Sequence, residues 1–181
     1  MSDISRGFFI AAALLLANPS SAAEAQIVSR YTDLSGGRCK LLKVDKETGS
    51  SVHKCPGVGG FQLLVLDDDS RVSVSVVDPN KKEYPLEYWN VITRSFSSLG
   101  RKAEWRAAQQ KGEIRPVALI VRVYTSEHAN LGSSGKKSYL AVAKISPREI
   151  CVTDKVAPGG NANESARQAA DVAAHKDCLK P

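Results

Sequence analysis

Four cysteines are the residues of this sequence with the clearest chemistry. Cys39, Cys55, Cys151 and Cys178 form no Cys-x-x-Cys motif, and no histidine stands at metal-finger spacing from them. In a chain that leaves the cytoplasm, an even number of cysteines predicts disulfides. Of the three possible pairings, Cys39–Cys55 and Cys151–Cys178 close the shortest loops and therefore cost the least entropy. We expect these two bridges and no free thiol.

A glycine-rich stretch, Pro56-Gly57-Val58-Gly59-Gly60, follows Cys55 directly. Backbone N–H groups of such a stretch bind phosphate when it joins a strand to the first turn of a helix. Here the stretch leads into alternating residues typical of a strand, and no lysine-serine or lysine-threonine pair follows. Close backbone approach, or a bend beside the disulfide, is the better interpretation.

The remaining chemical groups lack the spacing that catalysis or metal binding requires. The run Asp67-Asp68-Asp69 has neither the turn glycine nor the closing glutamate of a calcium loop, so it predicts a hairpin turn. Gly132-Ser133-Ser134-Gly135 reads as a flexible loop rather than a nucleophile elbow. We therefore expect no catalytic residue, no metal and no cofactor.

Alternation with period two dominates the chain from about residue 38 onward. Val72, Val74 and Val76 alternate with Ser73 and Ser75, which predicts a strand with one face toward a core. Further strands are expected at residues 39–44, 61–66, 88–96, 103–107, 117–124, 138–145 and 149–153. The fold class is therefore mainly β: an antiparallel sandwich or small barrel of about seven or eight strands with a C-terminal α-helix.

That helix is expected at about residues 163–177, with Asn163 as its N-cap and alanines at helical spacing along one face. A bridge from Cys178 to Cys151 would hold it on the sheet. Residues 38–181 are then a single disulfide-stapled domain, and residues 24–37 are expected to be a mobile lead-in.

The first residues resemble a secretory leader. Residues 1–23 combine a weakly basic start, a short apolar run and small residues before a cleavage site near Ala23 or Ala25. The apolar run is shorter than the roughly 18 to 20 residues that span a bilayer. The sequence predicts a periplasmic or secreted protein with no transmembrane span in the mature chain.

Charge suggests the kind of partner without naming one. The formal net charge is +6, spread along the chain rather than concentrated in one run. Such a balance favours an anionic envelope polymer, and the absence of a recognisable nucleic-acid motif argues against specific nucleic-acid binding. The oligomeric state stays open.

One loop carries a resemblance to a known family. The segment Ser134-Gly135-Lys136-Lys137-Ser138-Tyr139 is similar to the Ser-Gly-x-x-Tyr loop that periplasmic lysozyme inhibitors insert into the lysozyme cleft, and it is one residue longer. The resemblance implies a lysozyme as protein partner and a contact loop of Ser134, Gly135, Lys136, Lys137 and Tyr139. The stretch beginning at Cys55 also resembles uncharacterised exported proteins of Gram-negative bacteria.

We therefore expect an exported envelope protein that works as a non-catalytic binding or inhibitory module. Two alternatives stay open. Acidic residues such as Glu83, Glu87 and Glu104 allow a small periplasmic hydrolase, because a sequence cannot show whether two carboxylates face each other. The other alternative is a structural component of the envelope.

Overall fold

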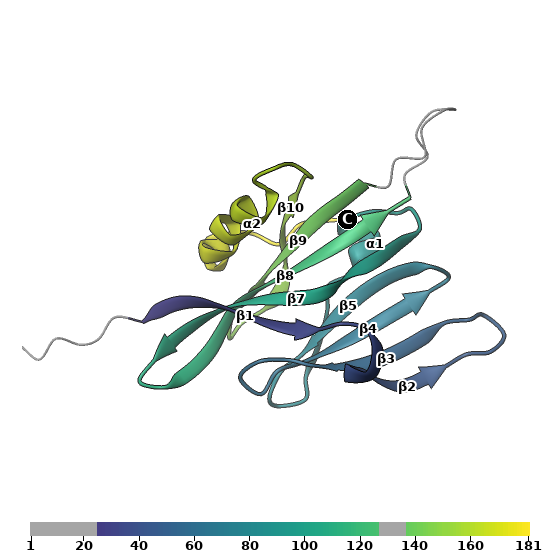
Figure 1. Ribbon diagram of the computed structural model, residues 1–181, viewed down its shortest axis with the longest axis horizontal. Coiled ribbons are helices and arrows are strands. Elements are labelled where there is room, and N and C mark those ends of the chain that lie inside the picture. The colour runs from purple at the N-terminus through teal and green to yellow at the C-terminus, as the bar shows by residue number, and fades with distance from the viewer. Residues whose placement is uncertain (1–24, 127–136) are drawn as a thin grey trace, which may run out of the picture.

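The structure is a computed structural model that describes residues 25–126 and 137–181. It is mainly β, with two antiparallel sheets of five strands each and a helix near the C-terminus (Figure 1). Sheet A has the order β1-β7-β8-β9-β10: β1 Gln26–Asp33, β7 Ser97–Gln110, β8 Glu113–Thr125, β9 Lys137–Ile145 and β10 Ile150–Val156. Sheet B has the order β2-β3-β4-β5-β6: β2 Lys40–Val44, β3 Ser51–Pro56, β4 Gln62–Asp68, β5 Arg71–Val77 and β6 Glu83–Pro85.

The two sheets pack face to face around one core. Leu63, Val74 and Val76 of sheet B meet Trp105 and Val121 of sheet A in it, and all five are fully buried. Neither sheet closes on itself, and within the described residues no strand pairing joins one sheet to the other. The predicted mainly-β sandwich is confirmed, the small-barrel alternative is wrong, and the expected seven or eight strands are too few, because the described residues form ten.

Strands β4 and β5 form the hairpin that the alternating valines predict. Asp68 pairs with Arg71, so only Asp69 and Ser70 form the turn, and both have positive φ. Two residues of positive φ define a type I′ turn, whose twist matches that of the flanking strands. Asp67 accepts a hydrogen bond from the backbone N–H of Ser70 at 3.1 Å, so one carboxylate of the aspartate run stabilises the turn.

Both faces of β5 are buried, whereas the alternating valines and serines predicted that one face would be exposed to solvent. Ser73 and Ser75 are each only 1% exposed. The cover includes α1, a short helix at Tyr88–Val91, which contacts β5 and buries Tyr88. Residues 88–96 were expected to be a strand, and this prediction is wrong. Glu87 has positive φ, which an extended strand cannot accommodate, and the Tyr88 N–H donates to Ser73 Oγ at 2.9 Å.

The two buried serines provide a matched stability test. Ser75 Oγ has no hydrogen-bond partner among the described residues, whereas Ser73 Oγ accepts from Tyr88. Ser75→Ala is therefore expected to raise the free energy of unfolding by about 1 kcal/mol, and Ser73→Ala to lower it by about 1–3 kcal/mol because it leaves a buried N–H unpaired. Urea titration of both variants checks this. A Ser75→Ala variant less stable than the parent would contradict the assignment.

The expected lead-in at residues 24–37 is largely regular structure, and that prediction is wrong. Gln26–Asp33 is β1, which pairs with β7 over its whole length, and a 3-10 turn, η1, follows at Gly36–Arg38. Thr32 anchors the strand, because its Oγ1 accepts a hydrogen bond from the buried Trp105 Nε1 at 2.8 Å. The predicted leader, residues 1–23, lies outside the described residues.

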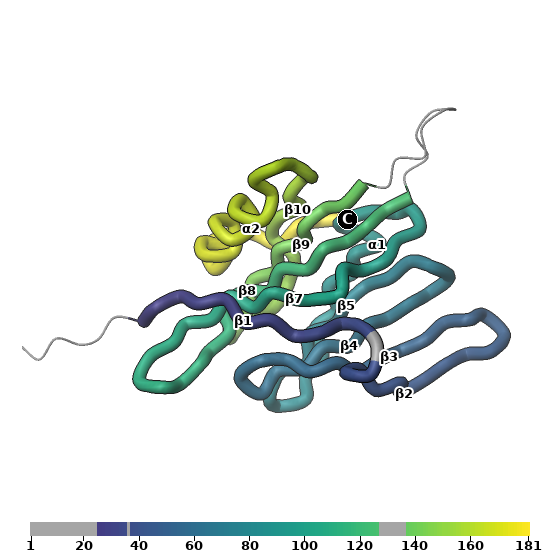
Figure 2. The backbone as a smooth tube through the Cα atoms, viewed as in Figure 1, coloured from purple at the N-terminus to yellow at the C-terminus, as the bar shows by residue number. Residues whose placement is uncertain are grey.

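The C-terminal helix is present but shorter than expected. α2 covers Ala162–Asp171, a 3-10 turn, η2, follows at Ala173–His175, and residues 176–181 form a tail without regular secondary structure. Asn161 rather than Asn163 occupies the N-cap position. Ala166 and Ala170 of α2 pack on the outer face of sheet A against residues such as Ile120 and Val142. Figure 2 shows α2 on one side of the molecule and the β2–β3 hairpin on the opposite side.

Candidate functional site

One end of the sandwich gathers exposed aromatic side chains. Leu119, Val121 and Val123 of β8 point into the core, so alternation directs Arg122 and Tyr124 to the outer face of sheet A. Tyr124 is 39% exposed, and Phe96, just before β7, is 53% exposed. Both rings line a hollow of about 330 Å³ whose other walls carry the Asp67 carboxylate, Val72 and several serine and threonine hydroxyls. Single exposed aromatics are ordinary, but two rings in one hollow indicate a contact surface.

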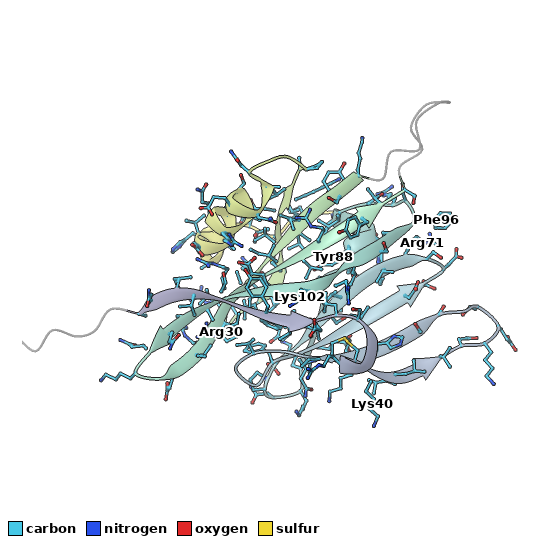
Figure 3. The ribbon with its side chains drawn as sticks, viewed as in Figure 1. Arg30, Lys40, Arg71, Tyr88, Phe96 and Lys102 are labelled. Carbon is cyan, nitrogen blue, oxygen red and sulfur yellow. A yellow bond between two sulfur atoms is a disulfide. The ribbon has the colours of Figure 1, made fainter. Side chains whose placement is uncertain are left out.

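A second hollow at the same end adds an indole and two guanidinium groups. It has a volume of about 310 Å³ and is lined by Trp89 and Asn90 of α1 together with Asp68, Arg71 and Arg94. The β4–β5 turn and α1 bring these residues together, because α1 packs on β5. Figure 3 shows Arg71 and Phe96 at this shared end. We call the set Arg71, Trp89, Arg94, Phe96 and Tyr124 the aromatic end.

The aromatic end carries charges of both signs, because Asp67 lines the first hollow and Asp68 lines the second beside Arg71 and Arg94. Arg71 lies 3.3 Å from Asp69, and both side chains are largely exposed, so this ion pair is weak. In the described part of the chain, no ion pair or hydrogen bond engages the Arg94 side chain. The aromatic end therefore combines stacking surfaces with guanidinium groups that are available to an anion.

A polar network holds α2 on the outer face of sheet A, away from the aromatic end (Figure 3). Arg106 donates two hydrogen bonds to the Asp171 carboxylate, each 2.8 Å long, and Arg167 donates to Glu104 Oε1 at 2.7 Å. The hydrogen bond to Asp171 raises the pKa of Arg106, and hydrogen bonds to Glu104 and Tyr31 raise the pKa of Arg167. Both guanidinium groups therefore stay charged and bind their carboxylates. Glu104, one of the acids that left a hydrolase open, is engaged in this network.

The residues that the family resemblance singled out lie only partly within the described structure. Ser134, Gly135 and Lys136 lie outside the described residues. Lys137 is the exposed first residue of β9 and pairs with Thr125 at the end of β8, so the connection between these strands starts and finishes at the aromatic end. Tyr139 is half-buried against the core, and the Lys155 ammonium lies 4.1 Å from its ring centre.

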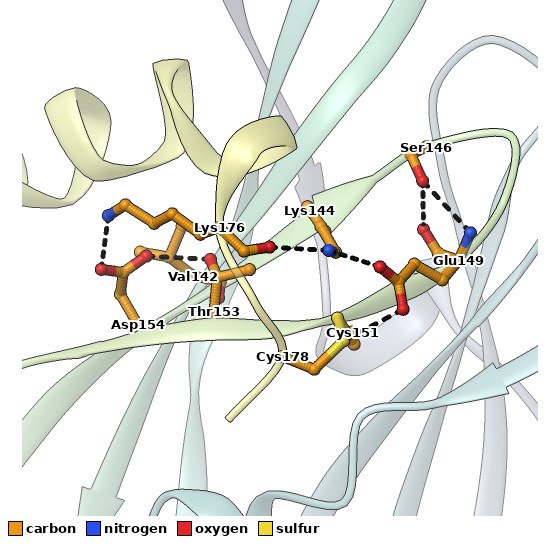
Figure 4. Close-up of a disulfide and its surroundings, with 9 residues drawn as sticks. All are labelled: Val142, Lys144, Ser146, Glu149, Cys151, Thr153, Asp154, Lys176 and Cys178. Atoms are coloured by element: carbon orange, nitrogen blue, oxygen red, sulfur yellow. Dashed lines mark hydrogen bonds and ion pairs between the residues drawn. A yellow bond between two sulfur atoms is a disulfide. The ribbon is translucent and has the colours of Figure 1, made fainter. Parts of the chain in front are cut away.

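Both predicted disulfides, Cys39–Cys55 and Cys151–Cys178, are present, and the described residues include no free cysteine. Cys55 is buried in the core rather than placed as a reactive thiol. The Glu149 carboxylate lies beside Cys151 and Cys178 (Figure 4). Because both sulfurs are in a disulfide, they offer no thiolate to a metal ion. Cys178 comes after α2 and η2, so its bridge tethers the tail rather than the helix.

The glycine stretch has the packing role expected of close backbone approach. A Cβ at Gly59 would lie 2.8 Å from Pro116 Cδ and 2.9 Å from the Ile114 carbonyl oxygen, and φ there is +60°. Only glycine fits such a position without strain. The contact closes one wall of a half-apolar cavity of about 430 Å³ at the other end of β4 and β8, which Phe61 and Tyr84 also line.

Comparison of the chain with known protein families, with curated proteins and with solved structures finds no match in any of the three. Among the described residues, no helix is long and apolar enough to cross a membrane. The two disulfides indicate an oxidising, extracytoplasmic environment.

Sequence reasoning missed every residue of the aromatic end. Trp89, Arg94 and Phe96 fall in or beside the segment that was expected to be a strand, and Arg71 was read only as part of the hairpin. One available signal was Pro85, which cannot donate to a sheet ladder and commonly ends a strand. A tryptophan and two further aromatics soon after such a break indicate an irregular segment that carries contact residues.

Proposed function

We propose that this protein is an exported envelope protein that binds an anionic envelope polymer through the aromatic end, without catalysis. The observation that carries the proposal is the grouping of exposed Phe96 and Tyr124 and half-buried Trp89 with Arg71 and Arg94 at one end of the sandwich. The predicted leader and the two disulfides support an extracytoplasmic site of action.

The chemistry of these side chains suits a charged glycan. Aromatic rings offer flat apolar faces against which sugar rings can pack at small entropic cost, because each ring has few rotatable bonds. Guanidinium groups bind carboxylate or phosphate in a two-pronged geometry. Within the described structure, the Glu104 and Asp171 carboxylates of the α2 network are held by arginines, which supports a binding role over an acid–base role for these two acids.

The affinity of the protein for anionic polymers can be measured with soluble peptidoglycan fragments and with polygalacturonate, a polymer that carries carboxylates. Dextran, a neutral polymer, is the control. Phe96→Ala combined with Arg94→Gln is expected to weaken binding to the anionic polymers about tenfold or more, since each lost contact costs about 1 kcal/mol or more. Calorimetric titration at low and physiological salt measures this. Binding should weaken with salt, because screening acts within about 8–10 Å.

Leu42→Ala with Lys43→Gln is the matched control. It also removes one apolar side chain and one cation, and both residues lie on the exposed edge strand β2. This control should leave the affinity unchanged. Equal losses in both double variants, or equal binding of dextran, would reject the aromatic end as the site.

A lysozyme inhibitor is the second candidate. The β8–β9 connection, which carries most of the resembling loop, departs from the aromatic end where Tyr124 is exposed. An inhibitor should slow at least one of the chicken-type, goose-type and invertebrate-type lysozymes at micromolar concentration, and Ser134→Ala with Lys136→Ala should abolish the effect. Full activity of all three enzymes would exclude this candidate.

A further inference from the structure

A small pocket beside α2 is separate from the aromatic end. It has a volume of about 150 Å³, and its lining comes from β1, β7, β8, β9 and the first turn of α2. The polar side chains of this lining are Tyr31, Lys102, Glu104, Arg122 and Asn163. At roughly 30 Å³ for each water molecule, the space is that of about five waters, which suits one carboxylate or phosphate group. We call it the helix-side pocket.

An irregularity in β7 lies beside the pocket. Leu99 pairs with Val123 and Ala103 with Val121, so residues 100–102 together oppose the single residue Arg122. Such bulges redirect side chains beside sites. Gly100 gives the room required, because a Cβ there would lie 3.0 Å from Arg122 Cβ. Ala103 points into the core, so alternation places Lys102 on the outer face of sheet A, where it lines the pocket together with Arg122.

The acceptors in the pocket wall are already in use. Glu104 Oε1 accepts from Ser29 Oγ at 2.6 Å and from Arg167 Nε at 2.7 Å, so a guanidinium balances the carboxylate charge. Asn163 Oδ1 accepts from Arg122 at 2.8 Å. Tyr31 Oη accepts from Arg167 at 3.3 Å. The pocket wall therefore has little acceptor capacity left for a ligand.

The donors, in contrast, remain available. Arg122 donates two hydrogen bonds, to Ser138 and to Asn163, and both acceptors are neutral. Among the described residues, no carboxylate pairs with its positive charge. No ion pair or hydrogen bond within the described ranges engages Lys102. The Tyr31 hydroxyl and the Asn163 amide keep their own protons to donate. The buried side chains of Ile120 and Leu140 border the pocket and exclude water on one side.

We propose that the helix-side pocket binds one small oxyanion, a carboxylate or phosphate group, with Lys102 and Arg122 supplying charge and Tyr31 and Asn163 supplying further donors. A wall of unsatisfied donors around two cations favours an anion over a neutral or cationic group. The proposal does not depend on polymer binding at the aromatic end.

Titration of purified, isotope-labelled protein with inorganic phosphate, acetate and sulfate tests this by NMR at constant ionic strength. At least one anion should give saturable shifts at the side-chain signals of Arg122 and Asn163, with a dissociation constant of about 1 mM or tighter, equivalent to about 4 kcal/mol. Phosphate and acetate are separate arms, so the preferred group is identified directly.

Lys102→Gln and Arg122→Gln should each weaken binding of the anion about tenfold, because each variant removes a charged donor. Lys102 is exposed, so its variant folds even if Arg122→Gln is destabilised. Lys111→Gln, in the β7–β8 turn at the far end of β7, is the matched control and should change nothing. Shifts that do not saturate, that persist in Lys102→Gln, or that map to Arg94 instead would overturn the proposal.

Discussion

Replacing Cys39 and Cys55 together by alanine is expected to lower the free energy of unfolding by about 3 kcal/mol. The bridge joins residues 16 positions apart, and its loss frees the unfolded chain to adopt more conformations. The native state is destabilised as well. All five residues of β2 are exposed, and β2 pairs with β3 alone, so few other contacts hold this edge strand.

The two bridges should differ in what they hold. The Cys151–Cys178 bridge ties down a tail that is also held by a hydrogen bond from the Leu179 N–H to the Val152 carbonyl oxygen, 2.7 Å long. Hydrogen exchange should therefore accelerate throughout β2 in the Cys39→Ala, Cys55→Ala variant. In the Cys151→Ala, Cys178→Ala variant, exchange should accelerate in the tail and leave α2 protected, because Arg106 and Arg167 still bind α2 to the sheet.

Thermal unfolding and amide exchange of both double variants measure these differences. Faster exchange in α2 after loss of Cys178 would show that the bridge, rather than the arginine network, holds the helix.

Replacing Glu149 by alanine is the second change for which a large effect is expected. The Lys144 side chain is nearly buried, and its Nζ lies 2.5 Å from Glu149 Oε1 and donates to the Lys176 carbonyl oxygen at 2.7 Å (Figure 4). Removing one partner of a fully buried pair costs about 3–5 kcal/mol, and the half-exposed Glu149 reduces this to about 2–3 kcal/mol. Glu149→Ala should accordingly lower Tm by about 5–10 °C.

Lys144→Met is the informative companion. It removes the buried charge itself and keeps the volume, so it should cost less than Glu149→Ala, and the double variant should recover most of the loss. A double-mutant cycle by urea unfolding gives the coupling energy. Additive losses would show that Lys144 does not depend on Glu149.

Local patterns in the sequence determined much of this fold. The Cys39–Cys55 and Cys151–Cys178 pairings follow from loop-closure entropy, and the β4–β5 hairpin follows from alternating valines around a run of aspartates. Alanines at helical spacing placed α2 to within a few residues at its start. These features depend on residues that are close together along the chain, so they can be predicted from the sequence alone.

The sequence-based predictions of secondary structure and exposure were wrong where packing against another part of the chain overrides the local conformational preference of a segment. Residues 88–96 have β-favouring composition, but Glu87 at positive φ and the burial of Tyr88 over β5 turn the chain into α1. Ser73 and Ser75 look solvent-facing by alternation and are buried, because a segment distant in sequence covers them. β1 lacks a strong pattern of its own and is a strand because β7 pairs with it.

The candidate sites were decided by tertiary structure alone. Phe96 and Tyr124 share one hollow because β7 and β8 are antiparallel neighbours, and Trp89 joins that end because α1 packs on β5. Lys102 and Arg122 line one pocket because β7 and β8 are antiparallel neighbours. Alternation states which residues of one strand share a face, but strand order, bulges and covering layers come from packing between distant segments. The sequence by itself therefore determined the disulfide staples and the β class, while packing decided which aromatic and cationic side chains meet.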